Sequence, residues 1–516
     1  MPFKTTPEVD FSSVGLITDV PTHSLPLGAW NDCLNLRCKD GSVQGVNKFI
    51  DNIALHDTDA VIIGGKARAV TQFTPAGYDH LVIAYIVEGT DGKGHVVTYN
   101  TGTSTYNNIT NSTANLEFTF DDTYPPQIFV FNELLIVNPA KDAPPMFTDT
   151  GVSSGSLNII PNWLTDSDTQ PIITRILRPF NNRLMAMNIF EEHLVGTGDD
   201  INLPIDIIWS SHITNVGSMN GVEWQASTTN TAGDAFATDT PGKILDGGQL
   251  GEFFIAYKSD SVIRVAETGD TFVLSFESIF EDDGIYSTRC FANIGNSQHL
   301  VVGNYGVYIH DGQAQKKDIA KGIFQDALYA LVKQSEKDRA FCFQQTRDKE
   351  VWFCLSSNSN TGAGTDLAFV YEYGSGKLHK RSVPNLTDIY ETEHNGVLEI
   401  YSTNPDSSTL KTLSNTLLEA DGFFLKEDDN LQDQSNVKWF NKIFLDAEDS
   451  LKIGLTATQN LTDAKTYNLI NFDPATGYKV DVRVTGRYLN LKVQMDGSKN
   501  PRLGKMQFET RKAGRR

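Results

Sequence analysis

The chain has 516 residues, and its 41 glycines, 29 phenylalanines and 17 tyrosines are typical of short strands separated by turns. Its net charge of −21 argues against a protein that grips nucleic acid through a strongly basic surface. The cysteines show no C-x-x-C spacing, so neither a disulfide framework nor a zinc site is predicted; they are Cys33, Cys38, Cys290, Cys342 and Cys354.

Residues 1–65 are predicted to form an N-terminal arm and the first strands. The opening residues, MPFKTTPEVDF, have no positively charged stretch followed by an apolar run, so we expect no signal peptide. No apolar run approaches the ~18 residues of a membrane helix. We therefore expect a chain that is made in a cytoplasm and has no membrane span.

Pairs of apolar runs separated by short polar turns fill residues 66–415. Residues 127–131 and 134–137, for example, flank the polar pair Asn132-Glu133, which is typical of a hairpin. The pattern returns at intervals of roughly 40 to 50 residues, the spacing of propeller blades. We predict an all-β fold in which this segment is a β-propeller-like array of antiparallel blades with loop insertions. An array of β-sandwiches is the alternative.

One helix, one loop and a final group of strands complete the predicted architecture. Residues 321–333 place apolar side chains on one helical face, as expected of a helix packed between blades. Residues 416–436 are predicted to be an acidic loop insertion. Residues 437–516 are predicted to be β-strands that close the propeller or form a platform. The acidic side chains of the loop are Asp421, Glu427, Asp428, Asp429 and Asp433.

Patterns typical of catalysis or cofactor binding are missing from the sequence. There is no phosphate-binding loop, no G-x-S-x-G elbow and no H-E-x-x-H. Residues 428–433 have oxygen ligands for calcium but lack the glycine and final glutamate of an EF-hand loop. Asp282 and Asp283 are adjacent, so on an extended chain they point to opposite faces and make a poor glycosidase pair. We predict a protein that is not an enzyme, with no catalytic residues, no metal site and no cofactor.

Near the N-terminus, a Pro-x-x-Ala-Trp turn ends at Trp30 and leads into an N-x-R-x-x-x-G pattern filled by Asn35, Arg37 and Gly41. This segment resembles the opening of the tail nozzle or tail hub proteins, also called packaged-DNA-stabilising proteins, of short-tailed bacteriophages (podoviruses). Further along, Trp209-Ser210 resembles the "W-S" strand of that family.

The resemblance continues to the end of the chain. Lys258 lies in a Lys-x-x-Ser-Val strand, Arg487 and Tyr488 lie in a Gly-Arg-Tyr strand, and Arg515 and Arg516 lie in the final Gly-Arg-Arg. One departure is Leu503, which follows Arg502 where the family often has tryptophan.

The resemblance implies a structural virion protein, made in the host cytoplasm, that forms the distal nozzle or hub ring of a phage tail. That ring, usually a hexamer, would retain the DNA genome and then conduct it during ejection, with double-stranded DNA only as passing cargo. The implied partners are tail adaptor or portal-side proteins and tail fibres or a spike. Residues implied to contact partners or support the structure are Trp30, Arg37, Trp209, Arg487, Tyr488, Arg515 and Arg516. Residues that could form a gate in the lumen are Lys316, Lys317 and Arg339.

Two other classes of protein share parts of this pattern. A propeller glycosidase or sialidase would also be all-β, but the sequence has no Ser-x-Asp-x-Gly-x-x-Trp box. A receptor-binding tail adhesin would more often carry long triple-stranded β repeats. Both stay open as alternatives to a nozzle protein.

Overall fold

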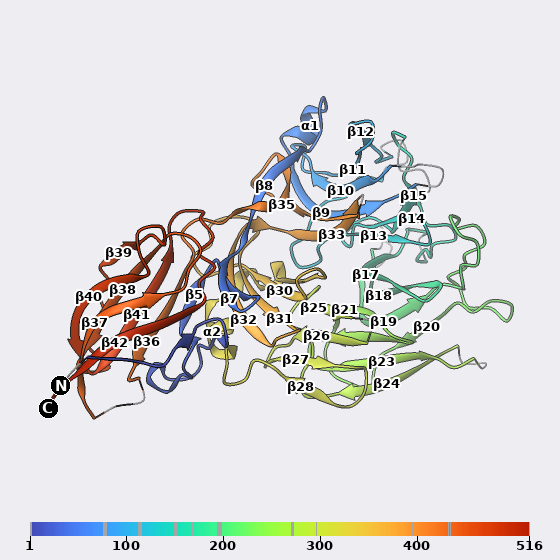
Figure 1. Cartoon of the computed structure of the whole chain (residues 1–516). Coiled ribbons are helices and arrows are strands. Elements are labelled where there is room, and N and C mark those ends of the chain that lie inside the picture. Colours follow the sequence, from blue (N-terminus) through green and yellow to red (C-terminus); the bar gives the residue numbers. More distant parts are fainter. Residues whose placement is uncertain are drawn as a thin grey trace.

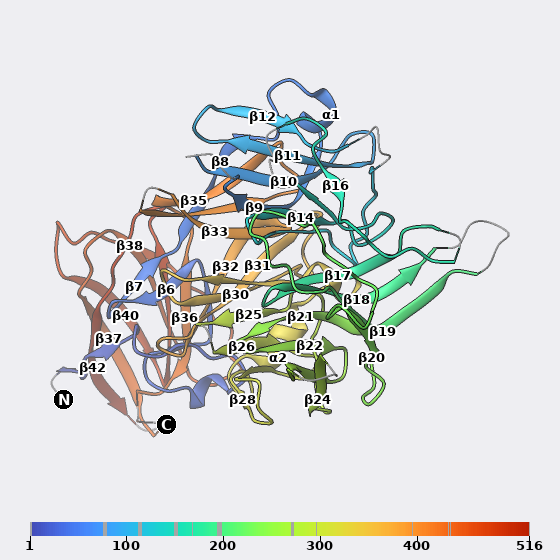
Figure 2. The same ribbon diagram turned by 90° about the vertical axis from the view of Figure 1, so that its right-hand side faces the viewer.

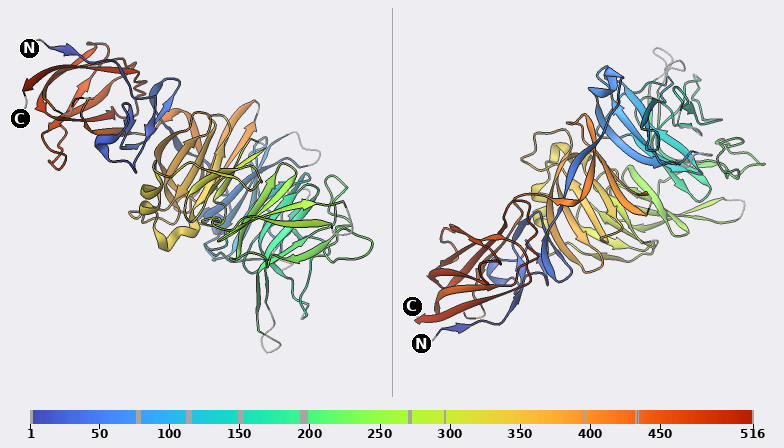
Figure 3. Two further views of the ribbon diagram at one scale, coloured as in Figure 1. Left: turned by 90° about the horizontal axis from the view of Figure 1, so that it is seen from below. Right: turned by 45° about the horizontal axis from the view of Figure 1, so that its top comes forward.

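The computed structural model describes residues 3–75, 80–111, 116–148, 153–167, 169–192, 199–269, 273–295, 297–394, 396–431, 433 and 435–514. Within these residues, seven four-stranded antiparallel sheets form a β-propeller, and two larger sheets form a β-sandwich beside it (Figure 1). Both ends of the described chain lie at the end of the sandwich that is remote from the propeller (Figures 1 and 3). The fold is all-β, as predicted.

The blades follow one another along the chain, and each runs from an inner strand to an outer strand. Blades 1 to 3 comprise β9 (Lys66–Phe73), β10 (Val82–Glu88), β11 (Gly94–Asn100) and β12 (Thr105–Asn108); β13 (Gln127–Phe131), β14 (Leu134–Asn138), β15 (Met146–Thr148) and β16 (Asn158–Ile159); and β17 (Ile173–Phe180), β18 (Arg183–Glu191), β19 (Ile201–Trp209) and β20 (Gly233–Phe236).

Blades 4 to 7 complete the ring. They comprise β21 (Ile244–Leu250), β22 (Phe253–Lys258), β23 (Val262–Glu267) and β24 (Leu274–Phe280); β25 (Phe291–Ile294), β26 (Gln298–Val302), β27 (Val307–His310) and β28 (Lys316–Asp318); β29 (Phe341–Gln345), β30 (Glu350–Leu355), β31 (Thr365–Glu372) and β32 (Lys377–Leu386); and β33 (Asp388–His394), β34 (Val397–Thr403), β35 (Thr409–Leu418) and β8 (Asn47–Ala54).

Local sequence explains both the blade strands and their turns. The middle strand β14 is buried along its whole length, because both faces of a blade pack against neighbouring blades. Asn132 and Glu133 both adopt positive φ, 52° and 62°, and join Phe131 to its partner Leu134. That is the geometry of a two-residue type I′ hairpin turn. The tight turn predicted at this pair is confirmed.

The propeller is closed by a strand from near the N-terminus. The outermost strand of blade 7 is β8, which pairs with β35 and leads into blade 1. On the inside of the ring, β33 of blade 7 contacts β9 of blade 1. Closure by residues 437–516, one of the two predicted roles of that segment, is therefore not what the structure shows.

The C-terminal strands build the β-sandwich instead. Sheet A has the order β1-β42-β37-β40, with β2 also paired to β42, and sheet C has the order β39-β38-β41-β36-β5. Buried side chains of both sheets, such as Ile443 and Leu491, belong to one core. The strands are β1 (Lys4–Thr5), β2 (Val9–Asp10), β5 (Asp32–Leu34), β36 (Phe423–Asp429), β37 (Val437–Leu445), β38 (Leu451–Thr458), β39 (Leu469–Phe472), β40 (Lys479–Gly486), β41 (Tyr488–Met495) and β42 (Lys505–Gly514).

The predicted acidic loop at 416–436 is wrong, because β36 occupies its middle. Residues of β36 alternate between the sandwich core and the outside, as in a strand with one packed face. Phe424 and Lys426 point inward, and the Lys426 ammonium donates to the carbonyl of Pro26 at 2.9 Å. The carboxylate of Asp428 accepts from Lys465 at 2.8 Å. Lys426 and Asp428, which the sequence predicted to be exposed to solvent, are thus bonded to other groups of the chain.

Short elements of the N-terminal arm between Gly15 and Gly45, together with α2 (Gln325–Leu331), fill the join between the two bodies, whereas α1 (Ala60–Ile63) lies beside blade 1 and η3 (Gln334–Arg339) leads to the propeller axis. The predicted helix at 321–333 is thus shorter in the structure. Its first N–H groups are capped from the arm, since Asp326 N donates to Asp19 Oδ2 at 2.9 Å. No helix among the described residues is long and apolar enough to cross a bilayer. The other short elements are β3 (Gly15–Leu16), η1 (Thr22–Ser24), β4 (Ala29–Trp30), β6 (Leu36–Lys39) and β7 (Ser42–Gly45).

Candidate functional site at the propeller axis

The inner strands of the blades surround the propeller axis (Figure 2). These strands and the loops before them bring charged side chains to the axis. Propellers have a central channel, and ligand sites are concave and lie where structural units meet, so the axis is a candidate site. The arginines there are matched by carboxylates from other blades. Three of these carboxylates, Asp246, Asp388 and Asp122, organise the region.

Asp246 joins blades 3, 4 and 5. Arg178 on β17 donates to it from Nε at 2.9 Å and from Nη2 at 3.0 Å, which is the bidentate geometry of a strong charged pair. The backbone N–H of Arg289, just before blade 5, donates to Asp246 Oδ2 at 2.7 Å. Asp246 is completely buried, so its charge depends on these donors.

Asp388 joins blade 7 to blades 1 and 5. Its Oδ2 accepts from the backbone N–H of Val70 at 3.0 Å, and its Oδ1 lies 3.4 Å from Arg289 Nη1. Burial raises the pKa of Asp388, while the Arg289 guanidinium and the backbone donors counteract that effect. The contact with Val70 ties the last blade to the first.

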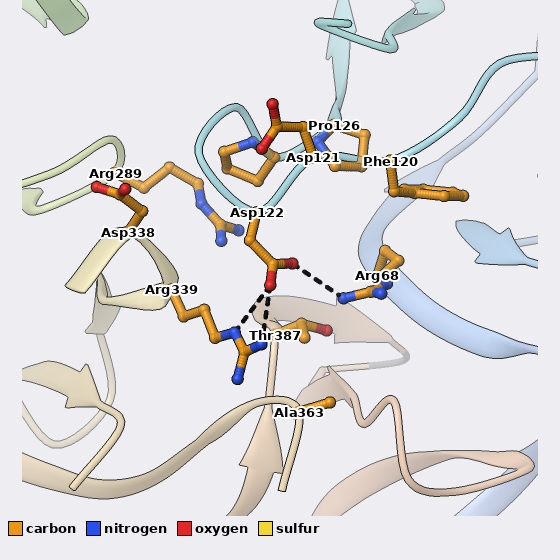
Figure 4. Close-up of a pocket in the computed structure, with 11 residues that line it drawn as sticks. Arg68, Phe120, Asp121, Asp122, Pro126, Arg289, Asp338, Arg339, Ala363 and Thr387 are labelled. Carbon is orange, nitrogen blue, oxygen red and sulfur yellow. Dashed lines mark hydrogen bonds and ion pairs between the residues drawn. The ribbon is translucent and has the colours of Figure 1, made fainter. Parts of the chain in front are cut away.

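Asp122, in the loop before β13, closes the axis (Figure 4). Its Oδ2 accepts from Arg339 Nε at 2.9 Å, and its Oδ1 lies 3.4 Å from Arg68 Nη1. Arg68 also pairs with Glu88 within blade 1. The cavity between these groups and Arg289 holds about 30 Å³, enough for about two water molecules. A cavity of this volume is too small to enclose a ligand of ordinary size.

The arginine–carboxylate pairs at the axis hold the blades to one another. Each of the three carboxylates is engaged by a guanidinium from another part of the ring. Among the described residues, no group of three or more histidine, cysteine or acidic side chains could hold a metal ion. The arrangement can transmit force between blades, since it connects blades 1, 3, 4, 5, 6 and 7 and the loop before blade 2.

A second polar network links blades 4 and 5 and fixes the tautomers of two histidines. The N–H of Gly312 donates to His310 Nδ1 at 3.1 Å, so His310 Nε2 carries the proton that it donates to Tyr257 Oη at 2.8 Å. Tyr257 in turn donates to His299 Nδ1 at 2.6 Å, and His299 Nε2 donates to the carbonyl of Gln249 at 3.1 Å. Burial lowers the pKa of His299 to about 3 and that of His310 to about 4.

An open polar depression lies on blade 3, with a volume of about 650 Å³. Its His212 Nε2 lies 2.6 Å from Arg183 Nη2 and 3.2 Å from Glu267 Oε1. The hydroxyl of Ser211 accepts the backbone N–H of Glu223 at 2.9 Å. These contacts hold the loop of residues 210–232 onto the blade, and His212, which lines the depression, is engaged by Arg183 and Glu267.

Trp30 and Arg37, predicted as partner or structural residues, lie inside the join between the two bodies. Trp30 is fully buried and stacks on Phe424 of β36 at 4.9 Å. Arg37 Nη1 lies 2.8 Å from Asp348 and 3.2 Å from Glu350, both on blade 6. Their contacts within the chain are structural.

The other residues singled out by the resemblance are dispersed. Trp209 ends β19 and donates from Nε1 to the carbonyl of Thr231 at 3.0 Å. Tyr488 begins β41, and Arg487 lies between β40 and β41, where its N–H donates to Thr458 O at 2.8 Å. Arg515 and Arg516 lie outside the described residues.

The three residues proposed as a gate are not brought together. Lys316 and Lys317 lie on β28, the outer strand of blade 5, and Lys316 pairs with the exposed Asp282 at 2.9 Å. Arg339 lies at the axis, on Asp122. Asp283 is turned away from Asp282 and is buried, and burial raises its pKa to about 6.

Asp122, Asp246 and Asp388 were missed by the sequence analysis. No local motif marks them, because their partners lie 43 to 318 positions away. The predicted strand positions did place Arg68 and Arg178 within blades, yet the carboxylates that meet them depend on how the ring closes.

Comparisons with known proteins add little beyond the fold. No protein-family model and no curated protein matches the chain. Among solved structures it is similar to the WD40 domain of Neurospora crassa Pan2, at 8% identity over 72% of this chain and 96% of that one, with a TM-score of 0.39. It is also similar to an exo-β-1,3-galactanase from Phanerochaete chrysosporium, at 10% identity over 92% and 90%, with a TM-score of 0.23. Such scores carry no argument about function.

Proposed function

We propose that this chain is a non-enzymatic structural subunit of a short-tailed phage tail, part of the nozzle or hub ring through which the genome leaves. In this proposal the subunit assembles with its own kind and with adaptor and fibre or spike proteins. Double-stranded DNA passes it as cargo.

The observation that carries the proposal is the place of the motif by which the chain resembles nozzle proteins. Asn35 Oδ1 accepts from the N–H of Ser382 on blade 6 at 2.8 Å, and Arg37 pairs with two carboxylates of the same blade. Gly41, at φ +71°, forms the turn of the β6-β7 hairpin. The motif thus fastens the sandwich to the propeller, as expected of a subunit that must stay rigid under load.

The closed axis determines where a conduit could lie. Because Asp122, Arg339 and Arg68 occupy the centre of the propeller, the proposal places the DNA in an opening enclosed by several copies rather than inside one propeller. A lumen with few exposed cations would bind the phosphates weakly, which suits a conduit.

Two measurements test the proposal. Electron microscopy of the protein assembled with tail components should show a ring with a central opening, whereas an elongated trimer would favour an adhesin, and a monomer that cleaves glycans would favour an enzyme. In a gel-shift titration at ~50 mM salt, where electrostatic binding is strong, linear duplex DNA should not shift. Micromolar binding with a steep salt dependence would contradict the passive conduit.

A further inference from the structure

Charge is strongly segregated along this chain. Residues 437–516 contain 15 lysines and arginines against 8 acidic residues, a net charge of +7, whereas residues 1–436 contain 28 against 56, a net charge of −28. The basic segment forms most of the sandwich. Such a separation creates a field that can orient a partner of opposite charge.

The outer face of sheet A concentrates this positive charge beside aromatic rings. Arg511 lies over the rings of Phe3 and Trp439, at 5.1 Å and 4.7 Å. At the other end of the face, Phe444 stacks on Tyr478 at 6.0 Å. The alternate residues of these strands fill the sandwich core, so the rings lie on the side away from it.

The exposure of this face is substantial. Tyr478 is 66% exposed and Phe3 is 38% exposed. On the edge strand β40, Lys479 and Arg483 are exposed on either side of Asp481. The other acid, Glu509, already accepts from Asn441. Aromatic residues and arginine are the side chains that concentrate binding energy in protein interfaces.

The part of blade 3 that follows Arg183 has the complementary composition, since the arginines of the blade, Arg175, Arg178 and Arg183, all come before it. Residues 184–242 contain eight acidic residues and neither lysine nor arginine. Among them, Asp234 and Asp239 are exposed, and Asp234 shares one side of the edge strand β20 with Phe236, which is 52% exposed. Burial, with the nearby Asp234 charge as the next cause, raises the pKa of Asp206 to about 6. Asp234 and Glu191 both lie close enough to Asp206 for their charges to repel it in the isolated subunit.

The two surfaces lie at opposite ends of the molecule. The sandwich adjoins blade 6 through the N-terminal arm, and blade 3 lies on the far side of the ring (Figures 1 and 3). A face and its complement at opposite ends allow one copy to bind the next head to tail, which generates a ring or an open chain.

We propose that the outer face of sheet A binds blade 3 of a second copy of this chain, with Lys479, Arg483 and Arg511 against its acidic side chains. This inference names the partner surface in the proposed ring and rests on that proposed function for its biological setting. A second copy fits better than DNA, because residues 1–436 supply the acidic, partly apolar surface that this face requires, and their charge of −28 repels a polyanion.

The full-length protein tests the contact by sedimentation velocity at ~50 mM and ~500 mM salt, since screening weakens exposed charge pairs. We expect concentration-dependent association at low salt that high salt abolishes. The double variant K479E/R483E should weaken association at least tenfold. The matched control K499E/R502E makes the same change in net charge elsewhere on the sandwich, where both side chains are about half exposed, and should associate like the unmodified protein.

A charge swap between the two surfaces is the decisive experiment. Adding D234K/D239K to K479E/R483E reverses both surfaces and should restore association. The proposed contact is wrong if K499E/R502E weakens association as much as K479E/R483E does, or if the charge swap does not restore association. DNA binding that K479E/R483E abolishes, without self-association in the unmodified protein, would assign the face to nucleic acid instead. If the variants associate normally but the protein is found in tails, only this inference fails; if the contact is confirmed but the protein is absent from tails, the proposed function fails.

Discussion

Asp122 and Arg339 are 217 positions apart in the chain, yet the Arg339 Nε atom donates to the Asp122 carboxylate at 2.9 Å at the centre of the propeller. The pair joins the loop before blade 2 to the segment before blade 6. It is thus a tie across the ring rather than between neighbours.

Replacing Asp122 with Asn should weaken this tie. The Asp122 side chain is 45% exposed, so solvent screens the pair and the expected loss is about 1 kcal/mol of unfolding free energy. Thermal denaturation measures it. The matched control is Asp282→Asn, which breaks the exposed pair with Lys316 on one blade and should leave stability unchanged. Equal effects of the two changes would contradict a special role of the axis.

The His299–Tyr257–His310 network predicts a loss of stability in mild acid. In the folded protein the pKa of His299 is about 3 and that of His310 is about 4, both below the ordinary value of 6.5. Between the folded pKa of each histidine and pH 6.5, the unfolded chain therefore binds more protons than the folded chain. Stability contributed by the neutral rings is complete above pH 6.5 and is lost as pH falls towards 4. Urea denaturation at pH 7.5 and 5 should show this loss.

A His310→Gln variant isolates the contribution of the network from that of buried carboxyls. Asp206 and Asp283, with pKa values of about 6, act in the opposite direction, because protonation of a carboxyl with a raised pKa favours the folded state. The variant should be less stable at pH 7.5 and should lose less stability on acidification. An unchanged pH slope would show that the histidines do not control it.

Arg37→Met should weaken the join between the sandwich and blade 6. The change leaves Glu350 buried without its main cation, and removing one partner of a buried pair costs about 3–5 kcal/mol. Burial tends to raise the pKa of Asp348, but Arg37 and Lys39 hold it at about 2, so its stabilising pair persists until strong acid. Limited proteolysis should cut the variant in the arm first. Lys39→Met, which removes the more exposed cation, should be far milder.

Phe508→Ala tests the C-terminal strand as a structural element. Phe508 is 1% exposed in the sandwich core, and truncating a buried phenylalanine costs about 3–5 kcal/mol. The neighbouring Gln507→Ala, on the outer side of β42, should cost less than about 0.5 kcal/mol. A loss of melting temperature that is equal for both would mean that this strand is not packed as described.

Blades 1 to 6 could be predicted because each is built from consecutive strands, whose apolar runs and tight turns, such as Asn132-Glu133, are visible in the sequence. Blade 7 takes its outer strand, β8, from the N-terminal part of the chain. The strand β36 could not be predicted, because its acidic residues are neutralised by Lys465, which lies 37 positions from Asp428. For the same reason the sequence did not predict the ion pairs at the propeller axis. Val70 meets Asp388 only after the ring has closed.

The closing strand has a consequence for the order in which this chain can mature. The strand β8 pairs with β35, which begins at Thr409. The strands β1 and β2 pair with β42, which lies at the other end of the sequence. Contacts between such distant segments form late and slowly. A ribosome must therefore synthesise β35, up to Leu418, before the propeller is complete, and β42, up to Gly514, before the sandwich is complete. A product terminated earlier has unpaired strand edges and is a substrate for proteolysis rather than a competitor for assembly.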